Sequence, residues 1–339
     1  MKVARLHAIR DIRLHDEPAP APGPHDELIR VTAAGICGSD LHWYAEGSVG
    51  TASLTRPLVL GHEFVGVIAS GKRKGQRVVI EPSDGCGVCE LCHAGHPNLC
   101  QNGLFAGYGP TDGCFRDYIT WPARLCLRVP DSLSFDEAAM TEPLAIGVYA
   151  VELAEPKPTD VAAILGAGAI GLSVLQAAKI CGARRIIVSE PIPERREMAS
   201  RLGASEVIDP SATDSDSELK RLTNGRGADI VYECTGEDDA TREASRMASI
   251  MGKVVVAGIP DCDEYRFDAS AARRKELRAV FVRRSNLTTE KAIEWVAERK
   301  ADVACFATHR FPLERAEEAM KLAIEKADGV VRAVVEVSR

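Results

Sequence analysis

The sequence contains no apolar run near the roughly 18 residues that a membrane-spanning helix requires. Its first residues include the charged Lys2 and Arg5, where a secretory signal peptide needs a continuous apolar stretch. Repeats of fixed period and low-complexity tracts are absent as well. We therefore expect a globular protein of the cytoplasm.

Basic residues are fewer than acidic ones. The chain has 42 Lys and Arg residues and 49 Asp and Glu residues, which gives a formal net charge of -7. A negative balance disfavours non-specific binding to nucleic acid or to an anionic membrane. Hydrophobic residues make up 45% and charged residues 27% of the chain, as in ordinary soluble proteins. The expected partners are therefore small molecules.

Two domains are expected, because 339 residues exceed the about 250–300 at which a single hydrophobic core stops growing. Residues 1–150 are rich in glycine, proline, cysteine and histidine and contain short strand-like runs, which predicts a loop-rich β domain. From residue 160 onward, apolar strands alternate with helical stretches, a pattern typical of a parallel sheet covered by helices. The predicted fold class is therefore α/β. The strand-like run at residues 330–337 has no partner that periodicity identifies.

A glycine-rich turn, Gly166-Ala167-Gly168-Ala169-Ile170-Gly171, follows the apolar run at residues 161–165 and opens a helical stretch. This is the context of a dinucleotide-binding turn. Gly166 permits a tight bend, Gly168 lets the backbone approach a pyrophosphate, and Gly171 lets the helix pack on the strand. The helix N–H groups that begin at Ala169 and Ile170 face the anion. The alternative is a glycine-rich turn in an unrelated α/β domain.

An acid supports the cofactor interpretation. Glu190 ends the next strand-like run, nineteen residues beyond Gly171, where a carboxylate accepts hydrogen bonds from the adenosine ribose hydroxyls. The same carboxylate repels a 2′-phosphate, so NAD is favoured over NADP. Arg195 and Arg196 are close enough in sequence to soften that repulsion.

Four cysteines fall within fifteen positions: Cys86, Cys89, Cys92 and Cys100. Four thiolates at such spacings can wrap one tetrahedral ion and leave no open position, which predicts a structural zinc site. Disulfides or free thiols are the alternatives, and a reducing compartment disfavours the first. His93 and His96 lie in the same loop and are possible substitutes for a cysteine.

A second candidate metal set is dispersed along the chain and comprises Cys37, His62, Glu63 and Glu142. Mixed sulfur, nitrogen and oxygen ligands suit a catalytic zinc that keeps one position for water or substrate. From spacing alone, the catalytic-zinc interpretation is about as favoured as the alternative, in which Cys37 is a buried structural residue and His62 is a hydrogen-bonded core residue.

With these residues in place, the chain resembles the zinc-dependent medium-chain dehydrogenases, and within them the sorbitol (L-iditol) dehydrogenase-like polyol dehydrogenases. The resemblance covers the whole length. The segments that carry it are residues 35–42, 61–63, 142–144, 166–171, 281–284 and 308–313, together with the four-cysteine lobe at about residues 84–102.

The resemblance implies a GroES-like catalytic domain built from residues 1–150 and 285–339, with a Rossmann NAD-binding domain at residues 151–284 inserted between them. It implies Cys37 and His62 as zinc ligands and Glu63 as the third. Glu142 then binds the metal directly or holds its water. No cysteine lies between Cys126 and Cys181, where the alcohol dehydrogenase branch has its second thiolate, so a carboxylate-containing site is favoured.

The resemblance also implies roles near the reaction. Ser39 and His42 match positions that pass the alcohol proton outward. Contacts to the cofactor are implied for the glycine turn, Glu190, Arg195, Val256, Ala257, Gly258, Phe281, Val282 and Arg283. Contacts to the substrate are implied for Trp43, Tyr44, Glu142, Arg283 and Arg284. Members of the family form homodimers or homotetramers, and the strand-like run at residues 279–282 is a candidate for pairing across a two-fold axis.

One departure bears on the substrate. The sorbitol enzymes place a tyrosine directly after the histidine that His42 matches, whereas this chain has Trp43 and then Tyr44. An indole cannot accept a hydrogen bond, so the pocket wall differs. L-Idonate 5-dehydrogenase, butanediol dehydrogenase and threonine dehydrogenase stay open as alternatives. Two further alternatives are also open. One is a zinc-free NADPH-dependent reductase of the same superfamily, although both candidate metal sets and Glu190 argue against it. The other is a non-catalytic NAD(H)-binding protein.

Overall fold

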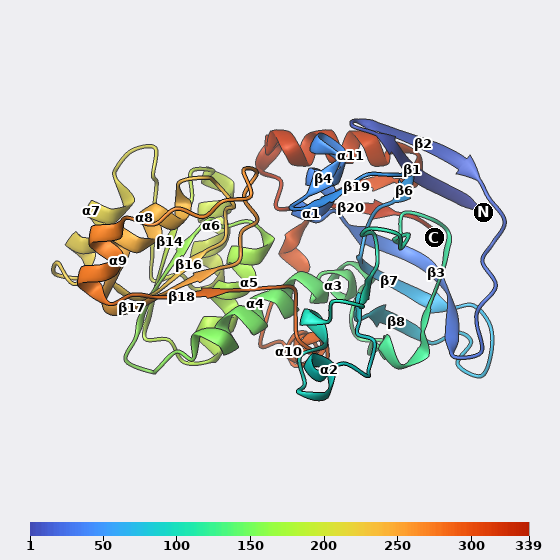
Figure 1. Cartoon of the computed structure of the whole chain (residues 1–339), viewed down its shortest axis with the longest axis horizontal. Coiled ribbons are helices and arrows are strands. Elements are labelled where there is room, and N and C mark those ends of the chain that lie inside the picture. Colours follow the sequence, from blue (N-terminus) through green and yellow to red (C-terminus); the bar gives the residue numbers. More distant parts are fainter. Residues whose placement is uncertain (339) are drawn as a thin grey trace. The chain divides into compact units, whose positions relative to one another are not determined.

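The computed structural model describes residues 1–338, and the chain in it forms two compact units (Figure 1). Unit 1 comprises Met1–Glu142, Thr289–Arg299 and Val303–Arg339, and unit 2 comprises Pro143–Thr288 and Lys300–Asp302. The sequence analysis placed the changes of domain at residues 150 and 284. The first change in the structure falls earlier, within helix α4 (Thr141–Ala154), because one continuous helix carries the chain across it.

Unit 1 is rich in short strands and loops. Its strands are β1 (Lys2–Ala8), β2 (Asp11–Asp16), β3 (Asp26–Gly35), β4 (Ser48–Val49), β5 (Ala52–Ser53), β6 (Leu58–Val59), β7 (Glu63–Ile68), β8 (Arg77–Ile80), β9 (Ser83–Asp84), β10 (Leu104–Phe105), β11 (Tyr118–Pro122), β12 (Cys126–Arg128), β19 (Ala307–Pro312) and β20 (Arg332–Glu336). Its α-helices are α1 (Gly38–Glu46), α2 (Glu90–His93), α3 (Phe135–Ala139), α10 (Thr289–Ala297) and α11 (Ala316–Glu325). Its 3₁₀ turns are η1 (Pro97–Leu99), η2 (Ala123–Leu125), η3 (Ala304–Phe306), η4 (Leu313–Arg315) and η5 (Ala327–Gly329).

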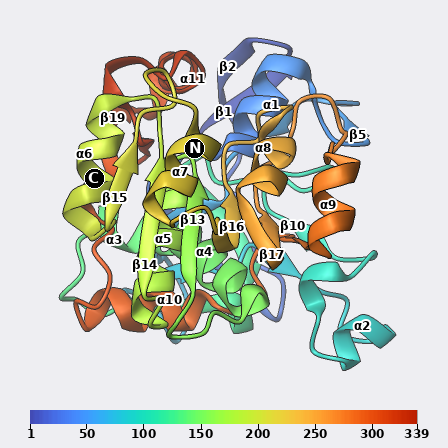
Figure 2. The same cartoon turned by 90° about the vertical axis from the view of Figure 1, so that its left-hand side faces the viewer.

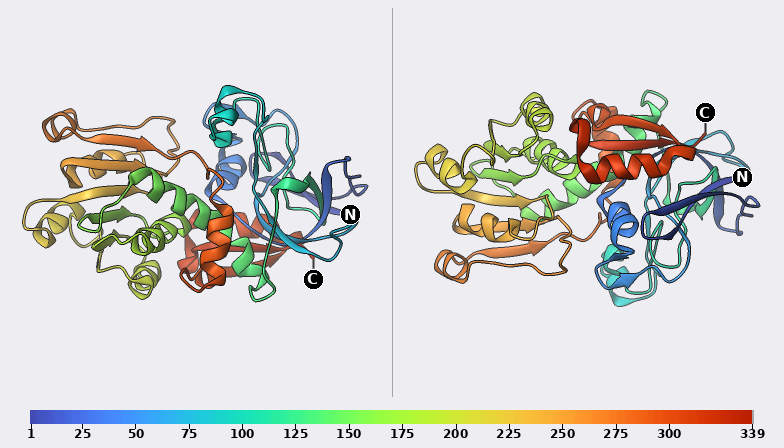
Figure 3. Two further views of the ribbon diagram at one scale, coloured as in Figure 1. Left: turned by 90° about the horizontal axis from the view of Figure 1, so that it is seen from below. Right: turned by 90° about the horizontal axis from the view of Figure 1, so that it is seen from above.

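The main sheet of unit 1 joins the two ends of the chain. Its strand order is β12-β8-β7-β3-β20-β19, with β11 also paired to β3. The C-terminal strand β20 is antiparallel to β3 and pairs Val334 with Gly35, and β7 pairs Glu63 with the same Gly35. Figure 3 shows the red C-terminal strands in one unit with the blue N-terminal strands. This pairing identifies the partner that periodicity could not assign to the last strand.

Unit 2 is built on a six-stranded parallel sheet of order β15-β14-β13-β16-β17-β18. The strands are β13 (Val161–Leu165), β14 (Arg185–Ser189), β15 (Glu206–Ile208), β16 (Ala228–Glu233), β17 (Ala248–Val256) and β18 (Arg278–Phe281). Besides α4, the helices are α5 (Ala169–Ile180), α6 (Pro193–Leu202), α7 (Ser215–Leu222), α8 (Ala240–Met247) and α9 (Ala269–Lys275). Figure 2 shows β14, β13 and β16 side by side among these helices.

The alternation of apolar strands and helices in unit 2 explains its sheet. Strands buried on both faces are continuous apolar runs, as in residues Ala162, Ala163 and Ile164 of β13. The predicted α/β class, with a GroES-like and a Rossmann-type part, is confirmed. Within residues 1–338, no helix is both long and apolar enough to span a membrane.

Candidate functional site

Three candidate metal ligands converge in unit 1. One ligand atom each of Cys37, His62 and Glu63 lies within 4.8 Å of the other two. Cys37 is the N-cap of α1, two residues after β3 ends at Gly35, and Glu63 opens β7 directly opposite Gly35. Pairing of these two neighbouring strands therefore brings together ligands that are far apart in the sequence.

Asp40 holds the two ligand-bearing segments in place. It is fully buried, and its Oδ2 accepts a hydrogen bond from the Cys37 N–H at 2.9 Å. Its Oδ1 accepts from the Gly61 N–H at 3.0 Å and lies 3.8 Å from Nδ1 of His62. Burial raises the pKa of the Asp40 carboxyl. The sequence analysis gave Asp40 no role, although an acid three residues after an N-cap is the signature of a capping box.

Glu63 is fully buried and paired with an arginine from the other end of the chain. Arg332 Nη2 lies 2.9 Å from Glu63 Oε1, and Arg332 Nη1 donates a hydrogen bond to the Ile36 carbonyl at 2.9 Å. A Cβ on Gly35 would lie 2.4 Å from Glu63 Oε2, so glycine is needed there to leave room for the carboxylate. The sequence offered no signal for Arg332, because the pairing depends on β20 lying beside β3.

The chemistry of this cluster fits a zinc ion. Among residues 1–338, Oε2 of Glu63 and Nδ1 of His62 are buried without a hydrogen-bond partner, and Oε1 of Glu63 has only its ion pair with Arg332. Burial and the negative charge of Glu63 raise the pKa of the Cys37 thiol to about 12. A divalent cation would favour the thiolate and use these unsatisfied atoms, and a set of one sulfur, one nitrogen and one oxygen ligand leaves a position open.

Glu142 lies in the first turn of α4 and is 5% exposed. Burial, followed by the charge of Glu63, raises the pKa of its carboxyl well above the usual range. Its oxygens do not belong to the group that the structure brings within 4.8 Å. A metal contact by Glu142, direct or through water, therefore stays a prediction.

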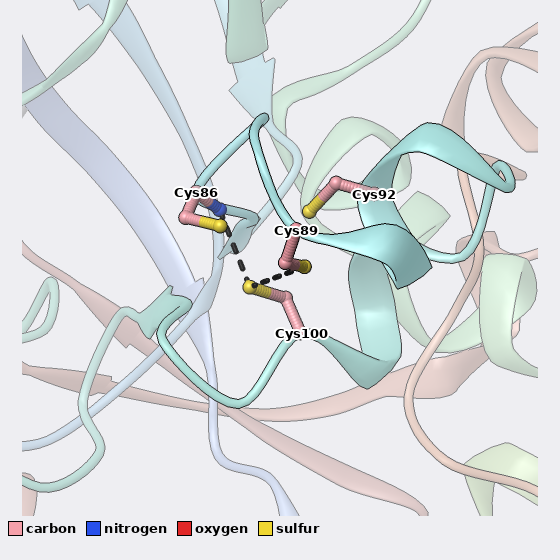
Figure 4. A group of neighbouring side chains, drawn as sticks. All are labelled: Cys86, Cys89, Cys92 and Cys100. Atoms are coloured by element: carbon pink, nitrogen blue, oxygen red, sulfur yellow. Dashed lines mark hydrogen bonds between the residues drawn. The ribbon is translucent and has the colours of Figure 1, made fainter.

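The four-cysteine lobe forms a second cluster in unit 1. Figure 4 shows the side chains of Cys86, Cys89, Cys92 and Cys100 pointing toward one another, and their sulfur atoms lie within 4.8 Å of one another. Sγ of Cys89 and Sγ of Cys100 are 3.8 Å apart, and all four thiols are free. Four sulfur ligands suit a closed structural zinc site. His93 and His96 are exposed and lie outside the group.

Helix α1 carries the two predicted proton-relay residues. Ser39 and His42 are both partly buried, and Nδ1 of His42 lies 3.1 Å from Oε1 of Glu46. Both side chains therefore lie within the first two turns of a helix whose first residue follows the candidate ligand Cys37.

The two predicted substrate contacts on α1 lie in the hydrophobic core. Trp43 is 1% exposed and packs edge-on against Tyr108, with ring centroids 5.6 Å apart. Tyr44 is 0% exposed, and its hydroxyl donates to Glu317 on α11 at 3.2 Å. Within residues 1–338, the Trp43 indole N–H has no hydrogen-bond partner. Contact of either residue with substrate stays a prediction.

In unit 2, the glycine turn and the predicted acid are joined directly. Glu190 is 3% exposed, and its Oε2 accepts a hydrogen bond from the Ala167 N–H at 2.6 Å. Gly166 has a φ of +89°, and a Cβ on Gly171 would lie 1.9 Å from the Gly166 carbonyl oxygen. Glycine is therefore required at both positions. A Cβ on Gly168 would be 3.9 Å from Nη1 of Arg195, which places that guanidinium beside the turn.

The other predicted cofactor contacts lie along the same edge of the sheet. Registers across the parallel strands align Ser189, Leu165, Glu233, Val256 and Phe281 in one row. The residues after each strand therefore emerge together at the carboxyl edge, where ligands of such sheets bind.

The backbone around this row is fixed by hydrogen bonds. The N–H groups of Ala257 and Gly258 donate to the carbonyl of Glu233, and the Val282 N–H donates to the Val256 carbonyl. Oε1 of Glu233, which is 1% exposed, accepts hydrogen bonds from the Thr235 and Gly236 N–H groups. The sequence analysis missed Glu233.

Beyond β18, the two predicted arginines differ in burial. Arg283 is exposed, and Arg284 is partly buried with a φ of +58°. Their contacts with cofactor and substrate stay predictions.

Comparisons with known proteins agree with both units. Residues 23–131 match the model of the alcohol dehydrogenase GroES-like domain, and residues 169–298 match the model of the zinc-binding dehydrogenase domain. Sorbitol dehydrogenase of Bacillus subtilis (strain 168) is 35% identical over 99% of this chain and 97% of its own length. The chain belongs to the zinc-dependent medium-chain dehydrogenases of the sorbitol dehydrogenase-like branch.

Two further proteins are similar to this chain over most of its length. L-Idonate 5-dehydrogenase of Vitis vinifera is 32% identical over 91% of this chain and 87% of its own length. A solved oxidoreductase of unknown specificity from Escherichia coli superposes with a TM-score of 0.93 at 30% identity, over 100% of this chain and 99% of that one. This zinc-dependent dehydrogenase is therefore an alcohol or polyol dehydrogenase that uses NAD(H), as the sequence predicts.

In zinc-free enzyme, replacing Arg332 with methionine is expected to cost about 3–5 kcal/mol of the free energy of unfolding, because it leaves the buried Glu63 carboxylate without its counter-charge. Denaturant unfolding measures this. The matched control is Arg310→Met, which breaks a partly exposed ion pair with Asp136 and is expected to cost less than about 1 kcal/mol. Equal losses in the two variants would contradict the role given to Arg332.

Proposed function

We propose that this dehydrogenase oxidises a secondary hydroxyl of a polyol such as sorbitol, L-iditol or xylitol, with transfer of hydride to NAD and formation of a ketose. The observation that carries the proposal is the convergence of Cys37, His62 and Glu63, in which a carboxylate completes the ligand set. Its support is the full-length similarity to a sorbitol dehydrogenase.

Cys37, His62 and Glu63 would hold the catalytic zinc, with Glu142 as a fourth group at the site. Zinc, when bound, supplies the Lewis acidity that lowers the pKa of the substrate hydroxyl toward neutrality. Asp40 keeps Cys37 and His62 oriented through the bonds it accepts from the Cys37 and Gly61 backbones. Arg332 offsets the negative charge of Glu63 and so limits how far the ligand set neutralises the metal.

Ser39 and His42 would carry the hydroxyl proton away from the site. A serine hydroxyl both donates and accepts, and an imidazole passes a proton between its two nitrogens. Glu46, 3.1 Å from Nδ1 of His42, would receive or release the proton at the surface end of this path. Cys86, Cys89, Cys92 and Cys100 would bind the second zinc and fix their lobe.

The glycine turn would bind the NAD pyrophosphate, and Glu190 would bind the adenosine ribose. In this structure, Glu190 accepts from the Ala167 N–H, so cofactor binding would exchange that bond for bonds from the ribose hydroxyls. Val256, Ala257, Gly258 and residues 281–283 would line the nicotinamide end of the same sheet edge.

A sugar acid is the second candidate substrate. The sequence favours it because Trp43 stands where the sorbitol enzymes have a tyrosine, although the Trp43 side chain is buried in the core of unit 1 and its effect on the substrate would be through packing. The similarity to a plant L-idonate 5-dehydrogenase supports this candidate.

Cys37→Ser is expected to lower turnover at least about 100-fold and to remove one of two zinc ions per chain, because it weakens the sulfur ligand. NADH formation on sorbitol, xylitol, L-idonate, 2,3-butanediol and threonine, with zinc analysis, measures both effects. Cys262→Ser, which replaces an exposed thiol in unit 2, is the control, and it is expected to retain full turnover and two zinc ions per chain.

The same panel decides the substrate class. The proposal expects the highest kcat/KM on a polyol. A higher kcat/KM on L-idonate establishes the second candidate, and full turnover by Cys37→Ser contradicts the metal assignment.

Glu190→Ser is expected to raise the selectivity for NADP relative to NAD at least about tenfold, because a carboxylate repels the 2′-phosphate. The ratio of the two kcat/KM values measures it. Glu194→Ser, at an exposed acid in the first turn of α6, is the matched control. An unchanged ratio in Glu190→Ser would remove Glu190 from the ribose site.

We further propose that the enzyme is a homodimer or homotetramer that pairs through β18. This strand is the outer strand of the parallel sheet, and Phe281 at its end is 52% exposed. The Ala279 N–H faces the free edge, because the Val282 N–H, which points the other way, bonds to β17. Sedimentation of the wild type is expected to give an oligomer, and Ala279→Pro, which removes this edge N–H, is expected to weaken it. A monomeric wild type refutes the proposal.

A further inference from the structure

A surface hollow of about 430 Å³ lies in unit 1 at the turn between β7 and β8. Nine residues line it, and five of them are basic: Lys72, Arg73, Lys74, Arg77 and Arg128. One lining residue, Asp131, is acidic. The chain as a whole has a net charge of -7, so the local excess of basic over acidic residues around this hollow is opposite in sign to the charge of the protein.

The side chain of Arg73 is held in place by hydrogen bonds to the residues around the hollow. Its Nη1 donates to the Ala123 carbonyl at 3.1 Å and its Nη2 to the Cys126 carbonyl at 2.8 Å. Its Nε donates to Gln76 Oε1, and Oε1 of Glu27 lies 3.7 Å from its Nη1. These bonds tie the β7–β8 turn to the segment around β12.

Arg77 is likewise held on its other side. Its Nη2 donates to the Leu133 carbonyl at 2.7 Å and its Nη1 to the Asp131 carbonyl at 3.4 Å. Its guanidinium carbon lies 4.3 Å from the centroid of the Phe135 ring. Its Nε is buried and has no hydrogen-bond partner within residues 1–338.

Three of the basic residues have no ion pair or side-chain hydrogen bond in the described part of the chain, and we call them the uncommitted cations: Lys72, Lys74 and Arg128. All three are exposed. Two glycines of positive φ, Gly71 at +78° and Gly75 at +87°, form the tight turn that presents both lysines. Backbone bonds between Ile68 and Gln76, and between Gly75 and Ile68, close that turn.

We propose that this hollow binds a small phosphate-bearing anion with at least two negative charges. Its volume is within the range of small-molecule pockets, and its uncommitted cations are donors that suit phosphate oxygens. Because five basic side chains line one hollow of about 430 Å³, a small anion can contact several of them at once. It lies at the opposite end of β7 from Glu63, about 17 Å along the strand, so a ligand here is separate from the metal cluster.

Binding of labelled inorganic phosphate and pyrophosphate to the zinc-loaded enzyme, by equilibrium dialysis with saturating NADH, tests this site. NADH blocks the pyrophosphate site of unit 2, and its own binding is followed by fluorescence. We expect one pyrophosphate per chain, bound at least about tenfold more tightly than phosphate, because it reaches more of the cations. Zinc analysis after dialysis verifies that the anion has not extracted the metal.

Lys72→Gln/Lys74→Gln/Arg128→Gln is expected to weaken pyrophosphate binding at least about tenfold and to leave turnover unchanged. The matched control, Lys157→Gln/Arg273→Gln/Arg274→Gln, removes three exposed charges in unit 2 and is expected to change binding less than about twofold, since distant exposed charges are screened. Thermal unfolding establishes that both variants fold.

The proposal is overturned if NADH-saturated enzyme binds no pyrophosphate, or if the hollow variant binds it as tightly as the wild type. Equal weakening in both variants overturns it too, because binding then follows net charge alone. Binding of acidic peptide but not of pyrophosphate would identify a protein-docking surface instead.

Discussion

The buried ion pair between Glu63 and Arg332 is the interaction on which unit 1 depends. A fully buried carboxylate needs hydrogen bonds or a counter-charge, and for Glu63 the counter-charge comes from the last strand of the chain. Arg332 also donates to the carbonyl of Ile36, 296 positions away, one residue before Cys37. The pairing of β20 with β3 therefore also positions Arg332 beside the candidate metal ligand Glu63.

Backbone pairing, rather than local sequence, sets the positions of the candidate metal ligands Cys37 and Glu63. Gly35 lies between Glu63 on one side and Val334 on the other, and its missing side chain leaves space for the Glu63 carboxylate. Asp40 then links the Cys37 and Gly61 backbones. The cluster is thus held by contacts that do not require the metal, which is typical of a site that is organised before the ion binds.

Features that depend on neighbouring residues in the sequence were predictable. The four-cysteine lobe was visible because its ligands lie in one loop, and the parallel sheet because each strand is an apolar run followed by a helix. The link between Glu190 and the glycine turn followed from strand order, since β13 and β14 are adjacent and parallel.

Contacts across long sequence separations were not predictable from periodicity. Arg332 was missed as a positioning group, because its partners Glu63 and Ile36 lie far away in the sequence. Asp40 and Glu233 were missed although each also accepts a hydrogen bond from a nearby backbone N–H, that of Cys37 and that of Thr235. Helix α8 ends at Met247, since Ala248 begins the strand β17 that pairs with β16. At Arg332 and at the end of α8, tertiary pairing decided what the local sequence pattern left open.

The central claim is that this chain holds one zinc ion by four sulfurs and a second by sulfur, nitrogen and oxygen ligands. Zinc K-edge X-ray absorption of the purified enzyme, combined with metal analysis, tests it most directly. The account predicts two zinc ions per chain, with an average shell of sulfur and of lighter atoms. In Cys37→Ser, it predicts one zinc ion with four sulfur neighbours. A wild type that holds a single zinc ion with sulfur neighbours alone would contradict the account.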